Sequence, residues 1–335
     1  MAVAPFEARV CRVDRGAVDV LLADGSVARA VIPHALLAAG LDDPTALPTV
    51  GDRVRVDPDG GLGVEVVGVL PRSALFVRAV ADERSRVQVL AANLDVVAIT
   101  ESCFPYPDLG RLERFLALAW ESGSQPAVLL TKADLVADVG DLVAEVTAVA
   151  PGCPVLAVSA VTGEGVAAVR ALCGGGLMAL LGSSGVGKSS LINALAGTEV
   201  MAVQEIRQDG KGRHTTAHRE MVTLAGGGAV VDTPGLRSVG LAAVDEGLDR
   251  AFDEITELAE GCRFGDCGHD GEPGCAVVAA LEAGTLDVRR LESWRKLRRE
   301  AAYMARRVDA RLAAAERAKW RAISKQSRQM QRLRP

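Results

Sequence analysis

The sequence lacks a hydrophobic run long enough to cross a membrane. Its longest apolar runs, such as residues 96–99, are far shorter than the roughly 20 residues that a transmembrane helix needs. Residues 1–9 also lack the basic flank and the hydrophobic stretch of a secretory signal peptide. These two absences predict a cytoplasmic protein with no membrane partner.

Cysteine is scarce as well, with seven residues in 335. Three of them lie between Cys262 and Cys275, and the other four are scattered through apolar or loop contexts. In a reducing compartment, cysteines with this distribution do not form a disulfide framework. Stability must therefore come from buried cores, for which 49% hydrophobic content and a length sufficient for two or three domains provide the material.

Charge is spread unevenly along the chain, although the net charge is only −5. Residues 294–335 contain fourteen Lys or Arg and three acids, which gives +11 there and leaves −16 for the rest. A basic tail of this kind favours nucleic acid, because lysine and arginine neutralise phosphates. The alternative is a charged helix face that is only solvated.

The first seventy or so residues alternate apolar and polar positions in short runs broken by Asp-Gly turns. A period of two predicts strands, because successive side chains of a strand point to opposite faces. The runs are Phe6–Val13, Ala17–Leu22, Val27–Ile32, Arg53–Asp57 and Gly63–Leu70. They predict a five-stranded β-barrel of the oligonucleotide/oligosaccharide-binding (OB) type in residues 1–72, and other five-stranded barrels fit nearly as well.

From about residue 94, apolar runs alternate with helical periodicity, as in an α/β domain. The runs suited to buried strands are Leu94–Thr100, Ala127–Thr131, Val155–Ser159, Leu177–Leu181 and Gly228–Asp232, and helical patterns occupy Leu109–Glu121 and Lys188–Leu195. This alternation predicts a doubly wound, mainly parallel sheet in residues 73–240.

Residues 241–335 are predicted to form a helical domain that ends in an arginine-rich helix starting near Thr285. Apolar residues recur there at three- and four-residue spacing, at Leu291, Trp294, Leu297, Ala301, Met304, Val308 and Leu312. One face of this helix should therefore pack while the other is basic.

A phosphate-binding loop is predicted between the apolar run ending at Leu181 and the next helical pattern. Its residues are Gly182, Ser183, Ser184, Gly185, Val186, Gly187, Lys188 and Ser189, followed by Ser190. The glycines let backbone N–H groups turn toward phosphates, Lys188 reaches the β- and γ-phosphates, and Ser189 offers a hydroxyl to Mg²⁺. A glycine-rich helix cap would not require lysine followed by serine.

Two short segments predict that the base is guanine. They are Thr131-Lys132-Ala133-Asp134 and Ser159-Ala160. The Asp134 carboxylate can accept both the ring N–H and the amine of guanine, whereas adenine leaves groups unpaired at about 1–3 kcal/mol each. Lys132 would lie along the base, and Ser159-Ala160 would supply an N–H to the guanine oxygen. In the alternative interpretations, Asp134 only caps a helical turn, or the loop serves an ATP-using enzyme.

The segments around the γ-phosphate carry the switch residues. Asp232 would contact Mg²⁺ through water and Gly235 would donate its N–H to the γ-phosphate, while either Thr215 or Thr216 would be the switch threonine. Leu236 stands where Ras-like enzymes commonly carry a water-orienting glutamine, so intrinsic hydrolysis should be slow. His214 is the nearest candidate by sequence to position the water, and its alternative interpretation is an exposed loop histidine.

The order of these motifs predicts a circular permutation. A Ras-like domain begins with the phosphate loop, but here the guanine segment at residues 131–134 precedes the loop at 182–189. The switch after Asp232 consequently leads straight into the C-terminal region. Nucleotide state is therefore expected to be coupled to a neighbouring domain.

A zinc site is predicted at Cys262, Cys267, His269 and Cys275, which have the spacing Cys-x4-Cys-x-His-x5-Cys. Three thiolates and one imidazole suit a closed tetrahedral Zn²⁺ site, in which no position is left for a substrate water. The metal should be structural. The alternative is three free thiols that are close by chance.

With these parts in place, the chain resembles the RsgA (YjeQ) family of circularly permuted GTPases that depend on the small ribosomal subunit. The resemblance covers nearly the whole chain and rests on the permuted order, the phosphate loop and the segments 93–95, 212–216, 232–235 and 262–277. It implies GTP hydrolysis stimulated by the 30S subunit, binding to 16S rRNA near the decoding region, and a role in late maturation followed by release.

The resemblance also implies roles for residues. It assigns GTP or GDP and Mg²⁺ to the loop and guanine segments, one Zn²⁺ to the cysteine cluster, and the family's proposed catalytic role to His214. Thr131 departs from the usual asparagine and offers fewer hydrogen bonds, which bears on nucleotide affinity. We expect a monomer, and the competing hypothesis is a binding module that holds GTP as a static ligand.

Overall fold

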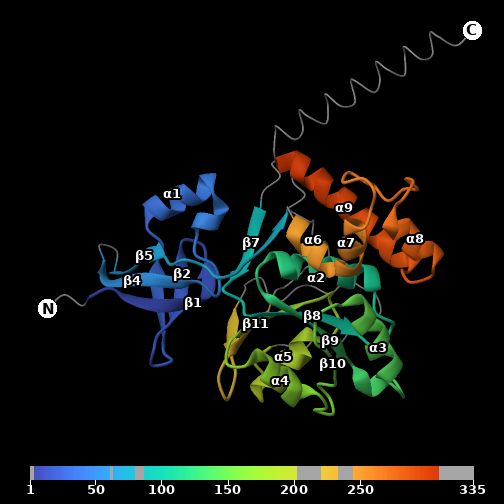
Figure 1. Ribbon diagram of the computed structural model, residues 1–335. Coiled ribbons are helices and arrows are strands. Elements are labelled where there is room, and N and C mark those ends of the chain that lie inside the picture. Colours follow the sequence, from blue (N-terminus) through green and yellow to red (C-terminus); the bar gives the residue numbers. More distant parts are fainter. Residues whose placement is uncertain (1–3, 61–62, 80–86, 202–219, 233–243, 309–335) are drawn as a thin grey trace, which may run out of the picture.

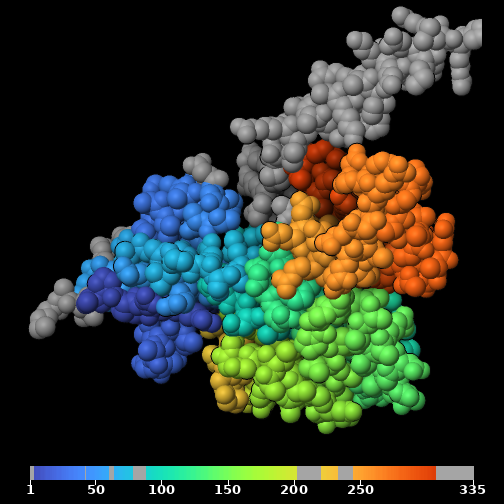
Figure 2. Space-filling model, viewed as in Figure 1, coloured from blue at the N-terminus to red at the C-terminus, as the bar shows by residue number. Residues whose placement is uncertain are grey.

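The structure, a computed structural model, describes residues 4–60, 63–79, 87–201, 220–232 and 244–308. Three regions follow one another along the chain and lie in contact: a barrel, a central sheet with its helices, and a group of C-terminal helices (Figure 1, Figure 2). Among the described residues, no helix combines the length and the apolar character needed to cross a membrane.

The N-terminal region is the predicted five-stranded barrel. Its strands are β1 (Phe6–Asp14), β2 (Ala17–Leu21), β3 (Val27–Val31), β4 (Arg53–Gly60) and β5 (Gly63–Val69), closed in the order β1-β2-β3-β5-β4. Alternate side chains such as Val10, Val18 and Val54 fill the interior, as the period of two requires. Helix α1 (His34–Asp42) and the short 3-10 helix η1 (Pro44–Ala46) follow β3 and were not predicted, because α1 is apolar nearly throughout and shows no amphipathic stripe.

The central sheet has six strands. They are β8 (Val96–Ser102), β9 (Gln125–Thr131), β10 (Val155–Val158), β11 (Leu177–Leu181), β12 (Met221–Thr223) and β13 (Ala229–Asp232), in the order β10-β9-β8-β11-β13-β12. All neighbours run parallel except β12, which is antiparallel to β13. This arrangement confirms the predicted α/β class.

Helices cover both faces of this sheet. Helices α2 (Leu109–Glu121) and α3 (Gly140–Val149) pack on one face, and α4 (Val166–Cys173) and α5 (Lys188–Ala196) pack on the other. Alternate strand residues serve the two layers: Val97 and Ile99 face α2, whereas Val96 and Ala98 face α5. The central strands are therefore apolar on both sides, which explains their continuous hydrophobic runs.

An antiparallel hairpin, β6 (Leu75–Ala79) and β7 (Val87–Ala92), connects the barrel to the sheet and was not predicted. Its last residues contact the barrel directly, because Ala92 N–H donates to Val50 O at 2.9 Å and Asn93 Nδ2 donates to Gly51 O at 3.2 Å. A Cβ on Gly51 would lie 2.1 Å from Ala92 O, so only glycine permits this approach.

The C-terminal region packs on the outer side of α2. It contains the helices α6 (Asp245–Ala251), α7 (Asp253–Glu260), α8 (Ala276–Glu282) and α9 (Val288–Val308), with the loop 261–275 between α7 and α8. Gly247 of α6 lies so close to α2 that a Cβ there would be 2.0 Å from Ala117 O. The predicted apolar face of α9 is buried at Leu291, Trp294, Leu297, Ala301 and Met304. Leu312 lies outside the described residues.

Candidate nucleotide and metal sites

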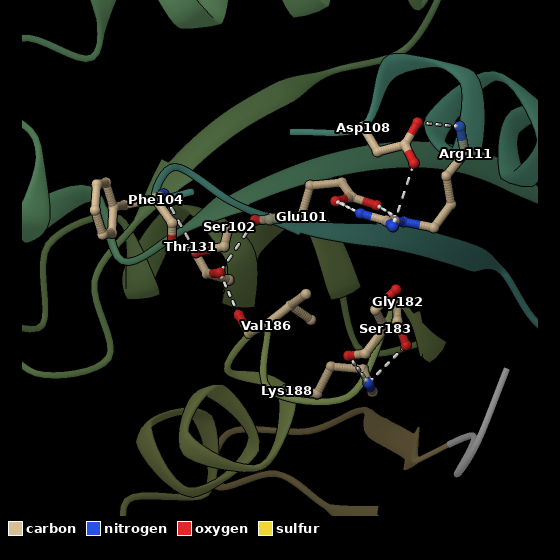
Figure 3. Close-up of polar contacts among 10 residues, drawn as sticks. All are labelled: Glu101, Ser102, Phe104, Asp108, Arg111, Thr131, Gly182, Ser183, Val186 and Lys188. Atoms are coloured by element: carbon tan, nitrogen blue, oxygen red, sulfur yellow. Dashed lines mark hydrogen bonds and ion pairs between the residues drawn. The ribbon is translucent and has the colours of Figure 1, made fainter. Parts of the chain in front are cut away.

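The phosphate loop lies between the end of β11 and the start of α5, where a helix N-terminus offers unpaired N–H groups to an anion. Gly182 approaches the end of β8 so closely that a Cβ would lie 2.3 Å from Thr100 O. Lys188 folds back over the loop and donates from Nζ to Gly182 O at 2.7 Å and to Ser183 O at 2.8 Å (Figure 3). The ammonium group is thus held where phosphates would meet it.

Lys188 and Asp232 form the electrostatic centre of the site. Burial lowers the pKa of Lys188, while Asp232 and Glu101 oppose this shift. Burial raises the pKa of Asp232, which is 6% exposed, and Lys188 opposes that shift. Asp232 ends β13 beside Leu180 of β11, and carboxylate and hydroxyl oxygens are the ligands that Mg²⁺ prefers. Asp232 with Ser189, at the start of α5, therefore fits a magnesium site.

Thr131, at the end of β9, joins the guanine segment to the phosphate loop. Its hydroxyl contacts the carbonyl oxygen of Val186 in the loop and that of Glu101, the latter at 3.1 Å (Figure 3). A hydroxyl has one hydrogen to donate, so it can satisfy only one of these acceptors at a time. Lys132 follows in a left-handed conformation with φ 58°, which turns the chain into η2 (Ala133–Leu135).

Asp134 is exposed and is held by the neighbouring strand. Ser159 Oγ, one residue past β10, donates to Asp134 Oδ1 at 2.5 Å. Ser159 Oγ also accepts from Val161 N at 3.2 Å and from Thr162 N at 3.1 Å, which fixes the loop that contains Ala160. Asp134, the Ser159-Ala160 turn, the phosphate loop and Asp232 thus all lie at the carboxyl ends of the sheet strands, although 98 positions separate Asp134 from Asp232 in the sequence.

The four predicted zinc ligands form a cluster whose ligand atoms all lie within 4.8 Å of one another. Cys262 Sγ is 3.6 Å from His269 Nδ1 and 3.9 Å from Cys275 Sγ, and Cys275 Sγ is 3.5 Å from the same nitrogen. In a tetrahedral site with Zn–S of about 2.3 Å and Zn–N of about 2.0 Å, ligand atoms lie roughly 3.5–3.8 Å apart. The three distances among Cys262, His269 and Cys275 are close to these values, and Cys267 lies within 4.8 Å of the other three, so the cluster is compatible with zinc.

The surroundings of His269 favour a metal ligand. The ring lies 5.5 Å from that of Trp294 on α9, and Arg295 donates to the His269 carbonyl oxygen. Burial lowers the pKa of His269, with Arg298 and Arg295 adding to the effect, so the neutral imidazole that binds metal is the favoured form. The cluster is thereby attached to the helix that packs on α2.

Comparisons with known proteins match this arrangement. A family model for the RsgA GTPase matches residues 69–242. A small ribosomal subunit biogenesis GTPase RsgA of Streptomyces coelicolor is 50% identical over 327 residues, covering 93% of this chain and 87% of that protein. The chain belongs to the RsgA GTPase family. The small ribosomal subunit biogenesis GTPase RsgA 1 of Listeria monocytogenes is 46% identical over 87% of this chain and 83% of its own.

Solved structures support the same assignment for the RsgA fold. YjeQ from Thermotoga maritima superposes with a TM-score of 0.65 and 27% identity, over 89% of this chain and 99% of that one. YloQ, described as a circularly permuted GTPase, has a TM-score of 0.60 and 22% identity over 89% of this chain and 95% of that one. The protein is thus a GTP hydrolase with permuted motifs, and the sheet order shows how: β11, which carries the phosphate loop, is central in the sheet but fourth of its strands in the chain.

Several residues predicted for the RsgA site lie outside the described residues. They are His214, Thr215, Thr216 and Gly235, together with Leu236. The structure therefore brings together the phosphate loop, the guanine segment and Asp232. The roles of residues 214–216 and 235–236 stay predictions from the sequence.

One part of the RsgA site was missed by sequence reasoning. Glu101, at the end of β8, is 1% exposed and pairs with Arg111 of α2 through two contacts, Nε to Oε1 at 2.8 Å and Nη2 to Oε2 at 2.6 Å. Asp108 caps the same helix by accepting from Arg111 N at 3.0 Å (Figure 3). The sequence does contain a sign of this pair: Glu101 directly follows an apolar run that predicts a buried strand, and a buried carboxylate needs a partner.

Proposed function

We propose that this protein binds GTP and Mg²⁺ at the carboxyl edge of the central sheet and couples GTP hydrolysis to late maturation of the small ribosomal subunit. The observation that carries this proposal is the convergence of the phosphate loop, Asp134 and Asp232 at one edge, in a chain 50% identical to a small ribosomal subunit biogenesis GTPase. We assign the protein to the cytoplasm, as a monomer.

In this proposal the nucleotide is held from both ends. Residues 182–190 bind the phosphates, with Lys188 turning from the carbonyl oxygens of Gly182 and Ser183 toward the β- and γ-phosphates. Thr131, Lys132, Ala133 and Asp134 bind the guanine with Ser159 and Ala160. Ser189 and Asp232 hold Mg²⁺, which supplies positive charge against the phosphates. Thr215 or Thr216 and Gly235 complete the site around the γ-phosphate.

The C-terminal region has two proposed roles. Zinc bound by Cys262, Cys267, His269 and Cys275 fixes the loop between α7 and α8, and the metal is structural because protein ligands fill all four positions. Helix α9 carries exposed basic residues, including Lys296 and Arg299, that suit the phosphates of 16S rRNA. The division into domains at residues 72 and 240 also stays a prediction.

The first experiment measures GTP turnover with purified 30S subunits, with 50S subunits and with no ribosome. We expect slow basal turnover, because Leu236 cannot orient water, and stimulation by 30S alone. Stimulation by 50S but not by 30S would contradict the assigned partner. Binding of GTP without turnover under all three conditions would favour a static binding module.

The second experiment tests the basic face of α9. Lys296→Glu/Arg299→Glu should weaken 30S association and flatten its salt dependence, because each lost phosphate contact lowers the log–log slope by somewhat less than one unit. Glu292→Lys, on the exposed side of the same helix, is the matched control and should steepen the slope. Basal GTPase activity should stay unchanged in both variants. Equal salt slopes in all three proteins would exclude this face.

The third experiment separates docking from chemistry. His214→Ala should bind 30S and GTP normally but lose stimulated turnover, if His214 positions the attacking water. Retained stimulation would leave the ribosomal role intact and exclude the histidine from the chemistry.

A further inference from the structure

Strand β1 of the barrel has one edge that is only partly covered by other barrel strands. On that edge β4 pairs with β1 from Phe6 to Arg9, while β2 occupies the opposite edge from Arg9 to Asp14. Beyond Arg9, an antiparallel main-chain bridge pairs Arg12 with Glu220, the residue before β12, while the Arg12 side chain donates from Nε to Asp14 Oδ1 at 3.4 Å. Because β2 already pairs with Arg12, the bridge uses the edge that β4 leaves open. The barrel thus extends the nucleotide sheet at its β12 end.

Apolar packing supports this bridge. Met221, the first residue of β12, is 7% exposed. It belongs to the large central hydrophobic cluster, which also includes Cys11 of β1. Val13 and Leu21 are partly buried against this cluster. Burial raises the pKa of the Cys11 thiol, and the negative charges of Asp19 and Glu220 raise it further, so Glu220 lies near Cys11. Main-chain pairing and side-chain burial therefore occur at the same place.

The register of the sheet connects the bridge to the magnesium site. The β12–β13 pairing ends with Met221 opposite Val231, and the same register continued by one step would place Glu220 opposite Asp232. Asp232 is in turn paired with Leu180 of β11, two residues before the phosphate loop. On this register, Arg12, Glu220, Asp232 and Leu180 occupy one row across four strands.

The barrel has a second attachment besides the bridge. Val50 and Gly51 accept hydrogen bonds from Ala92, which ends β7, and from Asn93, which follows it, at 2.9 Å and 3.2 Å. Asp52, fully buried, is bound by Arg72 in the connecting segment through contacts of 2.7 Å. The attachment at Arg12 has a different consequence: it fixes the edge strand at the level of Asp232.

We propose that Arg12 and Glu220 are positioning residues for the magnesium site, through which the barrel holds β12 and thereby sets the position of Asp232. This inference rests on the proposed nucleotide site. It makes the barrel a determinant of Mg²⁺ binding, and by thermodynamic linkage a nucleotide with Mg²⁺ strengthens the contact between barrel and sheet.

A charge exchange in the full-length protein tests this proposal. Directly opposed side chains in antiparallel strands interact by about 0.2–1 kcal/mol, and like charges there are unfavourable. Arg12→Glu should therefore weaken the slowing of fluorescent GDP dissociation by Mg²⁺ by about 1.5- to 5-fold. Arg12→Glu/Glu220→Arg should restore it. Dissociation in EDTA should stay unchanged, because the guanine contacts are intact.

Arg15→Glu is the matched control, because Arg15 is exposed at the end of the same strand and outside the bridge. It should behave like the unmutated protein. If Arg12→Glu also behaves like the unmutated protein, or if the double variant fails to recover, the positioning role is wrong. If Mg²⁺ does not slow GDP dissociation even in the unmutated protein, the nucleotide site itself is wrong.

A crosslink tests the contact independently of charge. Opposed residues of antiparallel strands have Cα atoms about 4.5–5.5 Å apart, within the range of a disulfide. Arg12→Cys/Glu220→Cys, in a Cys11→Ala background, should form a disulfide on mild oxidation and keep the full Mg²⁺ effect when oxidised. Arg15→Cys/Glu220→Cys should not form one. Failure of the first pair to crosslink, or loss of the Mg²⁺ effect in its oxidised form, would overturn the proposal.

Discussion

The zinc cluster and the nucleotide site are assembled in opposite ways. All four ligands of the cluster come from residues 262–275, and their atoms lie within 4.8 Å of one another. The nucleotide site takes its described residues from four segments between 131 and 232, which meet only because β9, β10, β11 and β13 end at one edge of the sheet. A local site requires a short flexible chain, whereas a distributed site requires the whole sheet.

The two sites are nevertheless joined through α2. One face of α2 reaches the nucleotide site through Arg111 and Glu101. Two residues further along, Glu113 is fully buried and accepts from Arg290 of α9 at 2.8 Å and from Arg289 at 2.9 Å. Arg290 also contacts Glu254 of α7 at 2.6 Å. The region that carries the cysteine cluster is thus held on the GTPase domain by buried charges as well as by apolar packing.

The largest expected effect comes from breaking the local site. Cys267→Ser should lower the zinc content from about one ion per chain and reduce thermal stability by several kcal/mol, because metal binding energy contributes directly to folding. GTP binding should largely survive, because the cluster lies outside the sheet. Elemental analysis and thermal unfolding measure both effects.

Cys153→Ala is the matched control for that variant, because Cys153 is buried and lies outside the cluster. It should retain zinc. Full zinc occupancy in Cys267→Ser would show that another ligand completes the site.

The next effect in size concerns the connection between the two regions. Glu113→Ala should destabilise the protein by up to about 3–5 kcal/mol, because Arg290 would lose the buried one of its two carboxylate partners and keep only the more exposed Glu254. Urea unfolding measures the change. Glu300→Ala removes the more exposed pair between α9 and Arg114 and should cost about 0–1 kcal/mol. Similar costs for the two variants would mean that α9 is held by packing alone.

The distributed site is tested by its base specificity. Asp134→Asn should weaken GTP binding by tens of fold, because the amide N–H would face the guanine amine, which is also a donor, at a cost of about 1–3 kcal/mol for each mismatched group. It should favour xanthine nucleotides, which carry an oxygen in place of that amine and can accept from the amide. Competition binding with GTP, ATP and XTP provides the measurement. Equal affinities for GTP and ATP in the unmutated protein would contradict the guanine assignment.

The smallest expected effect is a gain. Thr131→Asn should tighten GDP binding by up to about 1 kcal/mol, because an amide has two hydrogens for the carbonyl oxygens of Val186 and Glu101. Thr131→Ser, which keeps a single hydroxyl, should leave the affinity nearly unchanged. Titration with a fluorescent GDP would detect the difference, and a weaker Asn variant would show that the loop has no room for the amide.

Features that depend on local pattern could be predicted from the amino-acid sequence. Alternating residues specified the five barrel strands, and the glycine-lysine-serine pattern specified a loop between β11 and α5, because these features depend on backbone periodicity and on neighbours in the chain. The spacing of Cys262, Cys267, His269 and Cys275 likewise specified a compact cluster. The family relationship followed from these motifs and from their permuted order.

Contacts between residues far apart in the chain required the folded structure. Glu113 and Arg290, and Glu101 and Arg111, are each ordinary charged residues in the sequence, and nothing in their spacing selects one partner over another. Their pairing follows from the docking of α9 on α2 and the packing of α2 over β8, just as the main-chain bridge between Arg12 and Glu220 follows from the place of β1 beside β12. Long-range pairs of this kind depend on how the elements pack, since burial makes a partner necessary without saying where in the chain it lies.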